Sequence, residues 1–297
     1  MRFRCCSRTS AGRGGVMNDD PIREPLLVRW ILILLAVGAM ALLVLLPLLM
    51  VLSAAFGDGF RAWWAALSEP DAVAALSLTL FTVAIVLPIN AIFGTLTAWA
   101  LARFEFRGKR ALLSLIDLPF AVSPVVAGLC LVLLFGSHGW FASVLEALDI
   151  KILFARPGIV LATLFITFPF VVRELIPLME QQGPDEELAA RSLGAGAWTL
   201  FSRVTLPNIK WGLVYGVLLC SARAMGEFGA VSVVSGHIRG LTNTLPLHIE
   251  ILYNEFDTTA AFAAASLLSG LALITLVVKF WLEARHGDAL ASSHRKH

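Results

Sequence analysis

Long apolar runs dominate the pattern of hydrophobic and polar positions along this chain of 297 residues. Six runs are long enough to cross a bilayer, which takes about 20 helical residues at about 1.5 Å each. They cover residues 29–56, 76–101, 112–135, 158–178, 211–235 and 260–282. Apolar and polar positions do not alternate within them, so we predict six transmembrane helices rather than the strands of a spanning barrel.

Two of the predicted helices contain residues that interrupt a helix. The third carries Asp117 and Pro124, and the fourth carries Pro169 and Arg173. Proline removes a backbone hydrogen bond, and the groups that it frees are tolerated at membrane depth only against protein or a water-filled path. We therefore expect Asp117 to cap or hinge a broken third helix. We expect Arg173 to extend toward the headgroups near the cytoplasmic mouth.

Composition supports membrane placement. Hydrophobic residues make up 58% of the chain, charged residues 15%, and the mean hydropathy is +0.81, whereas soluble domains are about half apolar and about a quarter charged. The net charge of +2 is too small to indicate a nucleic-acid partner. The four cysteines, His237 and His248 lack metal-ligand spacing, and we expect both histidines to be ordinary polar residues of the last external loop.

The distribution of Lys and Arg predicts the orientation, because cytoplasmic loops retain positive charge. If the N-terminus is inside, the outer segments hold only four such residues: Arg61, Lys151, Arg156 and Arg239. Both termini are then cytoplasmic, with tails at 1–28 and 283–297 around a membrane domain at 29–282. Residues 1–16 lack the apolar core of a signal peptide. We expect them to be disordered, or an extension upstream of a second possible start at Met17.

The one sizeable cytoplasmic loop covers about residues 184–210. Pro184 and the three acidic residues after it favour a helix start, because acidic side chains interact well with the positive end of the helix dipole. Gly194 and Gly196 should break or bend this helix, and an amphipathic stretch at 198–204 follows. Such a small helix-turn-helix suits docking onto a partner. Amphipathicity alone favours an interfacial helix lying on the headgroups.

This loop resembles the EAA loop of bacterial ABC importer permeases, whose pattern is Glu-Ala-Ala, three residues, Gly, nine residues, Ile-x-Leu-Pro. When the motif glycine is aligned with Gly194, the remaining matches are Ala189, Ala190, Val204, Leu206 and Pro207. The glutamate position is occupied by Leu188, and Glu187 lies one residue upstream. The resemblance makes Glu187 the candidate for the acidic contact with the ATPase.

The resemblance implies an all-α fold of type I importer architecture and a set of partners. In that family the loop forms coupling helices in a cleft of a separate ATP-hydrolysing subunit, of which two copies are expected. The resemblance also implies a second, homologous permease that forms a heterodimer with this chain, an extracytoplasmic binding protein and membrane lipid. ATP and Mg would be used by the ATPase. The chain itself is expected to bind no cofactor or metal and not to be an enzyme, since phosphate-loop, HExxH and GxSxG motifs are absent from the sequence.

Three further segments resemble the permeases of sulfate and thiosulfate importers, most of all the W-type subunit. They are IDLPFAVSPVVAGL at 116–129, FPFVVREL at 168–175, and the stretch at 222–257 that begins ARAMGEFGA. The last motif also resembles molybdate permeases, so a permease for molybdate or another oxyanion is the alternative. A second alternative is a passive channel or an assembly subunit, and such a protein would not need a coupling loop.

Charged residues inside predicted membrane helices mark a pathway or a structural ion pair, because charge there is costly. Arg223 and Glu227 are four residues apart and share one helix face. They either neutralise each other or leave Arg223 to attract an anion, and the sequence leaves both open. The candidate pathway or gate residues are Arg223, Glu227, Asp117, Pro124 and Arg173.

Overall fold

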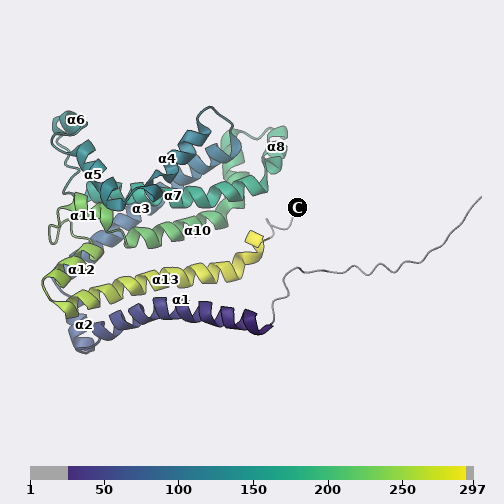
Figure 1. Cartoon of the computed structure of the whole chain (residues 1–297). Helices are drawn as coiled ribbons and strands as arrows, with labels where there is room; N and C mark the ends of the chain where they lie inside the picture. The colour runs from purple at the N-terminus through teal and green to yellow at the C-terminus, as the bar shows by residue number, and fades with distance from the viewer. Residues whose placement is uncertain (1–25, 292–297) are drawn as a thin grey trace, which may run out of the picture. The chain divides into compact units, whose positions relative to one another are not determined.

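A computed structural model describes residues 26–291, and every secondary-structure element in that range is helical (Figure 1). The elements are α1 (Leu26–Ala55), α2 (Phe60–Leu67), α3 (Pro70–Arg103), α4 (Lys109–Ala121), α5 (Pro124–Phe135), α6 (Ala142–Ala147), α7 (Arg156–Gln182), α8 (Asp185–Ser192), α9 (Ala197–Leu200), the π-helix η1 (Phe201–Thr205), α10 (Leu206–Met225), α11 (Gly229–Ser235), α12 (Leu245–Asn254) and α13 (Thr258–Ala291). The predicted all-α class is confirmed. The predictions for residues 1–16 and for Met17 lie outside the described residues.

The chain divides into two compact units, residues 1–47 and 48–297. The described part of the first unit is most of α1, a very apolar helix of 30 residues that contains Pro47. The second unit holds all the other described elements. The site discussed below lies entirely within this second unit.

Four helices, α1, α3, α7 and α13, are long and apolar enough to cross a membrane. Two further spans result if each of two bent helix pairs counts as one. The pair α4 and α5 is bent by 111°, and residues 197–225 are bent by 54° against α11. The six predicted spans therefore correspond to four single helices and two bent pairs.

Proline acts differently in the two interrupted segments. The break between α4 and α5 lies at Val122 and Ser123, and Pro124 begins α5, where a missing N–H has no cost. Asp117 lies within α4 and does not cap it. By contrast, α7 runs through Pro169 without a break. The expected interruption is thus a true bend only in the third span.

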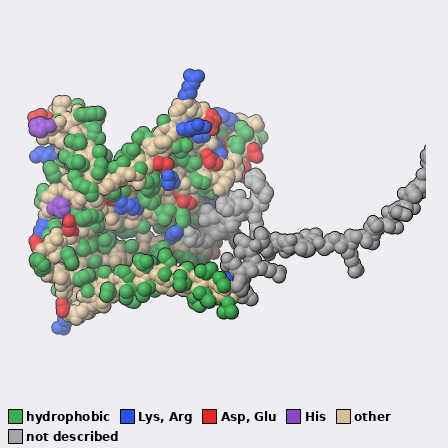
Figure 2. All heavy atoms as spheres, in the orientation of Figure 1, with side chains coloured by type: hydrophobic (Ala, Val, Ile, Leu, Met, Phe, Trp, Pro, Cys, Tyr) green, Lys and Arg blue, Asp and Glu red, His purple; other side chains and the backbone are tan. Residues whose placement is uncertain are grey.

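Charged side chains gather at two ends of the second unit, whereas hydrophobic side chains cover most of the surface between them (Figure 2). One charged end lies over α4 and α8, and the other over α2, α6 and α12. This distribution is expected of helices that cross hydrocarbon and end in headgroups or water.

Helices α3, α7 and α10 form the centre of the second unit. Their buried apolar side chains include Val86, Leu101, Val171, Leu175, Met179 and Ile209. Glycines bring the backbones close: a Cβ added to Gly94 would lie 2.9 Å from the Val171 side chain, and one on Gly216 would lie 3.3 Å from the Val171 Cα. Within lipid, such close packing of small residues is a main source of helix association.

A buried asparagine ties these three helices together. The Asn90 Nδ2 group on α3 donates to Thr167 Oγ1 on α7 at 2.8 Å and to Cys220 Sγ on α10 at 3.2 Å. All three residues are buried. Hydrogen bonds between side chains of different helices hold membrane bundles together by about 1 kcal/mol each.

The bent pairs meet where α5 packs against α11. A Cβ on Gly128 of α5 would lie 2.7 Å from the Ala230 carbonyl oxygen, and one on Gly229 of α11 would lie 2.8 Å from Pro124 Cβ. The two short helices therefore contact each other almost backbone to backbone. A movement of either one has to displace the other.

Helix α12 was not predicted, and it changes the account of the last external loop. His248 lies on α12 and is buried, so the expectation of an ordinary loop residue was wrong. Burial lowers the pKa of His248, because the charged imidazolium is disfavoured away from water. His237 fits the expectation better, since it lies in the turn after α11 and is partly exposed.

Candidate functional site: the coupling loop and the charges of the spans

The predicted coupling loop folds as two short helices around a glycine turn. Helix α8 starts directly after Pro184 with three acidic residues in its first turn. It ends at Ser192, and Gly194, two residues later, has a left-handed φ of 84°. The Ala195 N–H donates to the Ala190 carbonyl at 3.1 Å, and the Gly194 N–H donates to the Arg191 carbonyl at 3.0 Å. This pattern is a Schellman cap, which favours glycine because a Cβ is strained at positive φ.

Glu187 points into the protein rather than away from it. Its Oε2 accepts from Arg103 Nε at 3.0 Å, and its Oε1 accepts from Thr205 Oγ1 at 2.8 Å. Arg103 also donates through Nη1 to the Met179 carbonyl at 2.7 Å. The two charged side chains are only 10% and 13% exposed. The neighbouring Glu186 accepts from Asn208 on α10, at an exposed position.

The loop exposes large apolar side chains among its charged ones. Leu188, Leu193 and Trp198 are exposed, Leu193 by 89% and Trp198 by 77%. Ala189 is exposed next to them and Ala190 is half-buried. We did not single out Leu193 or Trp198 from the sequence. The available signal was one large apolar residue on each side of the turn at 194–196, Leu193 directly before it and Trp198 two residues after it.

A π-helix joins this loop to α10. Its five residues, Phe201–Thr205, include the motif residue Val204, and α10 then begins with Leu206 and Pro207. Val204 and Leu206 are half-buried and Pro207 is exposed. Phe201 contacts Trp99 edge to face, with ring centroids 5.5 Å apart. Single π turns are rare and often occur at functional sites.

Arg223 and Glu227 form an ion pair at the bend between α10 and α11. Arg223 Nη1 lies 2.6 Å from Glu227 Oε2, and the Glu227 side chain is only 1% exposed. The other carboxylate oxygen accepts from the Ala230 N–H at 3.0 Å, in the first turn of α11. Glu227 therefore stabilises the start of α11 while it neutralises Arg223, and the pair holds the bend.

Arg173 and Asp117 form a second ion pair, which joins α7 to α4. Arg173 Nε donates to Asp117 Oδ1 at 2.7 Å, and the guanidinium lies 4.9 Å from the centroid of the Phe120 ring. Both charged side chains are about half exposed. The structure thus places four of the five candidate pathway residues in two ion pairs. Pro124, the fifth, lies in the contact between α5 and α11.

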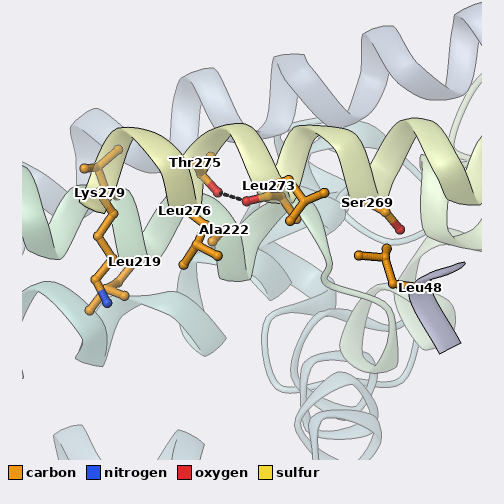
Figure 3. A pocket seen from close by; sticks show the side chains of 10 residues that line it. Leu48, Leu219, Ala222, Ser269, Leu273, Thr275, Leu276 and Lys279 are labelled. Carbon is orange, nitrogen blue, oxygen red and sulfur yellow. Dashed lines mark hydrogen bonds between the residues drawn. The ribbon is translucent and has the colours of Figure 1, made fainter. Parts of the chain in front are cut away.

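A cavity of about 370 Å³ between α10 and α13 is not an anion site (Figure 3). Its lining is mainly aliphatic, from Leu48, Leu219, Leu273 and neighbouring residues, with Lys279 at one end. The Lys279 ammonium lies 4.8 Å from the centroid of the Tyr215 ring. A doubly charged oxyanion would lose its hydration here and would find few hydrogen-bond donors, since only Ser269, Thr275 and Lys279 among the lining side chains can donate. Among the side chains that the structure describes, no cluster of His, Cys, Asp and Glu could hold a metal ion either.

A family model described as binding-protein-dependent transport system inner membrane component matches residues 90–287. The chain belongs to this family. It is therefore a multi-pass inner-membrane permease component of an ABC transporter and not the ATPase, and the predicted family resemblance is confirmed.

Several relatives have similar length. The chain is 51% identical to the sulfate transport system permease protein CysW of Synechocystis sp., over 88% of this chain and 94% of that protein. It is 49% identical to CysW of Escherichia coli K12, over 86% of this chain and 88% of the relative. The chain is 39% identical to the sulfate transport system permease protein CysT of Escherichia coli K12, over 85% of this chain and 93% of that protein.

A solved structure supports the fold. The crystal structure of a bacterial alginate ABC transporter, in complex with an alginate pentasaccharide-bound periplasmic protein, contains a chain that matches with a TM-score of 0.72. The match covers 88% of this chain and 96% of that one, at 18% identity. At this identity the match shows the fold alone, which is that of an ABC importer permease.

Proposed function

We propose that this chain is the W-type permease subunit of an ABC importer that moves sulfate and thiosulfate into the cytoplasm. The observation that carries the proposal is an identity of about half, over nearly the full length, to permeases of sulfate transport systems. The chain does no covalent chemistry. Its spans provide a path that opens alternately to the two sides of the membrane.

The proposed complex contains two different permeases. Escherichia coli has both a relative at 49% identity, CysW, and one at 39%, CysT, and each matches this chain over most of its length. We therefore assign it a T-type partner in a heterodimer. Two ATPase subunits, which use ATP and Mg, and an extracytoplasmic sulfate-binding protein complete the assembly.

The coupling loop is the proposed contact with one ATPase subunit. Leu188, Leu193 and Trp198 present an exposed apolar surface on a segment that also carries Asp185, Glu186 and Arg191. Large apolar and aromatic side chains are the usual anchors of protein interfaces. The Schellman turn at Gly194 keeps this surface in one shape, so docking costs little conformational entropy.

Both termini are cytoplasmic in this proposal, as the distribution of Lys and Arg indicates. Reporter fusions at Arg107 and Ala195 should give cytoplasmic signals, and fusions at Asp58 and Ser143 should give external ones. An external signal at Ala195 would place the loop on the wrong side for an ATPase.

Uptake in a defined strain tests the substrate. Cells that lack their own W-type permease should regain ATP-dependent uptake of radiolabelled sulfate when they express this chain with its T-type partner, ATPase and binding protein. Excess thiosulfate should compete and molybdate should not. Uptake of molybdate without sulfate would refute the assignment, and uptake that persists with an inactive ATPase would indicate a channel.

A further inference from the structure

We propose that Arg103 and Glu187 form the internal link through which movement of the coupling helix α8 reaches the membrane helices. This inference rests on the proposed function, because it concerns how that importer couples ATP hydrolysis to transport. It assigns Glu187 a positioning role inside the permease. The contact with the ATPase is then made by the exposed apolar residues of the loop.

The link follows from the position of Arg103. Arg103 is the last residue of α3, a span of 34 residues. Its guanidinium donates at once to Glu187 on α8 and to the Met179 carbonyl on α7. One side chain therefore joins the coupling helix to two membrane helices. Arginine suits this role because its planar group donates in several fixed directions.

Glu187 extends the link to a third membrane helix. Its second carboxylate oxygen accepts from Thr205, the last residue of the π-helix and the residue directly before α10. The main packing contacts of α8 are with the short elements α9 and η1. The Glu187 carboxylate bonds α8 directly to α3 and to Thr205, and the exposed Glu186 adds a bond from Asn208 on α10.

Burial makes the link stiff. The Arg103 and Glu187 side chains are 10% and 13% exposed, so water and salt screen their attraction far less than that of a surface pair. The exposed pair of Lys109 and Glu105, at 2.7 Å near the same end of α3, contrasts with it. The Glu105 side chain is 89% exposed, and such pairs contribute little.

The same geometry argues against Glu187 as the ATPase contact. Both of its oxygens are already bonded within the permease. Turning the side chain outward would leave Arg103 partly buried without its partner, which is costly. The large apolar residues that this segment exposes are Leu188, Leu193 and, on α9, Trp198.

The test uses the complete importer in proteoliposomes, with sulfate uptake and ATP hydrolysis measured on the same samples. The variants are Glu187→Gln, Arg103→Gln and the double variant, with Glu105→Gln as the control in the exposed pair. The double variant matters because Arg103→Gln alone leaves a partly buried carboxylate and can reduce assembly. All rates are normalised to assembled complex.

We expect each single variant to lower the sulfate imported per ATP hydrolysed by about tenfold, and the double variant to be no worse, since all three cut one link. Glu105→Gln should leave this ratio unchanged. If Arg103→Gln and the double variant keep the wild-type ratio, the link is refuted. If only variants at Glu187 lose coupling, Glu187 contacts the ATPase directly and the proposal is wrong. A wild-type complex that hydrolyses ATP without moving sulfate would instead refute the proposed function.

Discussion

Replacing Arg223 with glutamine removes the partner of a buried carboxylate. Glu227 is 1% exposed and lies 2.6 Å from the Arg223 guanidinium. Its other oxygen keeps the hydrogen bond from the Ala230 N–H. The variant therefore strands a charge at the bend between α10 and α11 while it preserves the local backbone geometry.

The structure sets the expected size of the effect. Removing one member of a buried ion pair costs about 3–5 kcal/mol. The remaining bond to Ala230 places the expected loss near the lower end, at about 3 kcal/mol. When Glu227→Gln is added, the charge disappears and the amide oxygen can still accept from Ala230, so the residual cost should fall to about 1 kcal/mol.

The assay compares abundance with transport. Assembled transporter is quantified by pull-down from membranes, and sulfate uptake is divided by that amount. Arg223→Gln should be depleted several-fold, and the double variant should recover both assembly and uptake per complex. Recovery of assembly without recovery of uptake would refute this reasoning. It would show that the charge of Arg223 acts on the anion.

Three other changes have defined outcomes. Gly194→Asp should leave the permease in the membrane but uncouple ATP hydrolysis from sulfate uptake. A Cβ at φ 84° costs about 1–2 kcal/mol, and the new charge enters the docking surface. Gly196→Ala is the control, since Gly196 has a φ of −70°. Gly128→Ala should reduce assembly and heat stability, since its Cβ would meet the Ala230 carbonyl at 2.7 Å, whereas Gly270→Ala has open space and should behave as wild type. Because the pKa of His248 is lowered in the folded protein, the contribution of His248 to stability is present above about pH 6.5 and is lost as the pH falls through the lowered pKa. Thermal unfolding measured at about pH 7.5 and at about pH 5 should show this loss of stability. The His248→Gln variant should show a smaller loss.

The sequence predicted the spans well because the bilayer imposes a length and a composition on any helix that crosses it. Residues 76–101 and 260–282 fall inside α3 and α13. Proline patterns were less decisive: Pro124 marks a bend of 111°, but Pro169 lies in an unbroken helix. Proline alone does not say whether neighbouring helices compensate for the lost hydrogen bond.

The site was only partly predictable. The pairing of Arg223 with Glu227 follows from local helix geometry, since four residues bring two side chains to one face. Arg103 and Glu187 are 84 residues apart, and no local pattern could reveal that they bond. The motif alignment made Glu187 the candidate for the ATPase contact, and it gave no sign that both carboxylate oxygens are bonded within the permease.

The hydrogen bonds of Asn90 have a consequence for the synthesis and membrane insertion of the protein. Asn90 is synthesised first, and its two partners come 77 and 130 residues later along the chain. Until α7 and α10 have been made, the Asn90 amide of α3 lacks both of these partners. The amide gains Thr167 when α7 arrives and Cys220 only when α10 follows. A nascent chain that ends before α10 thus lacks the Cys220 acceptor, and the Asn90 amide makes both bonds only in the nearly complete chain.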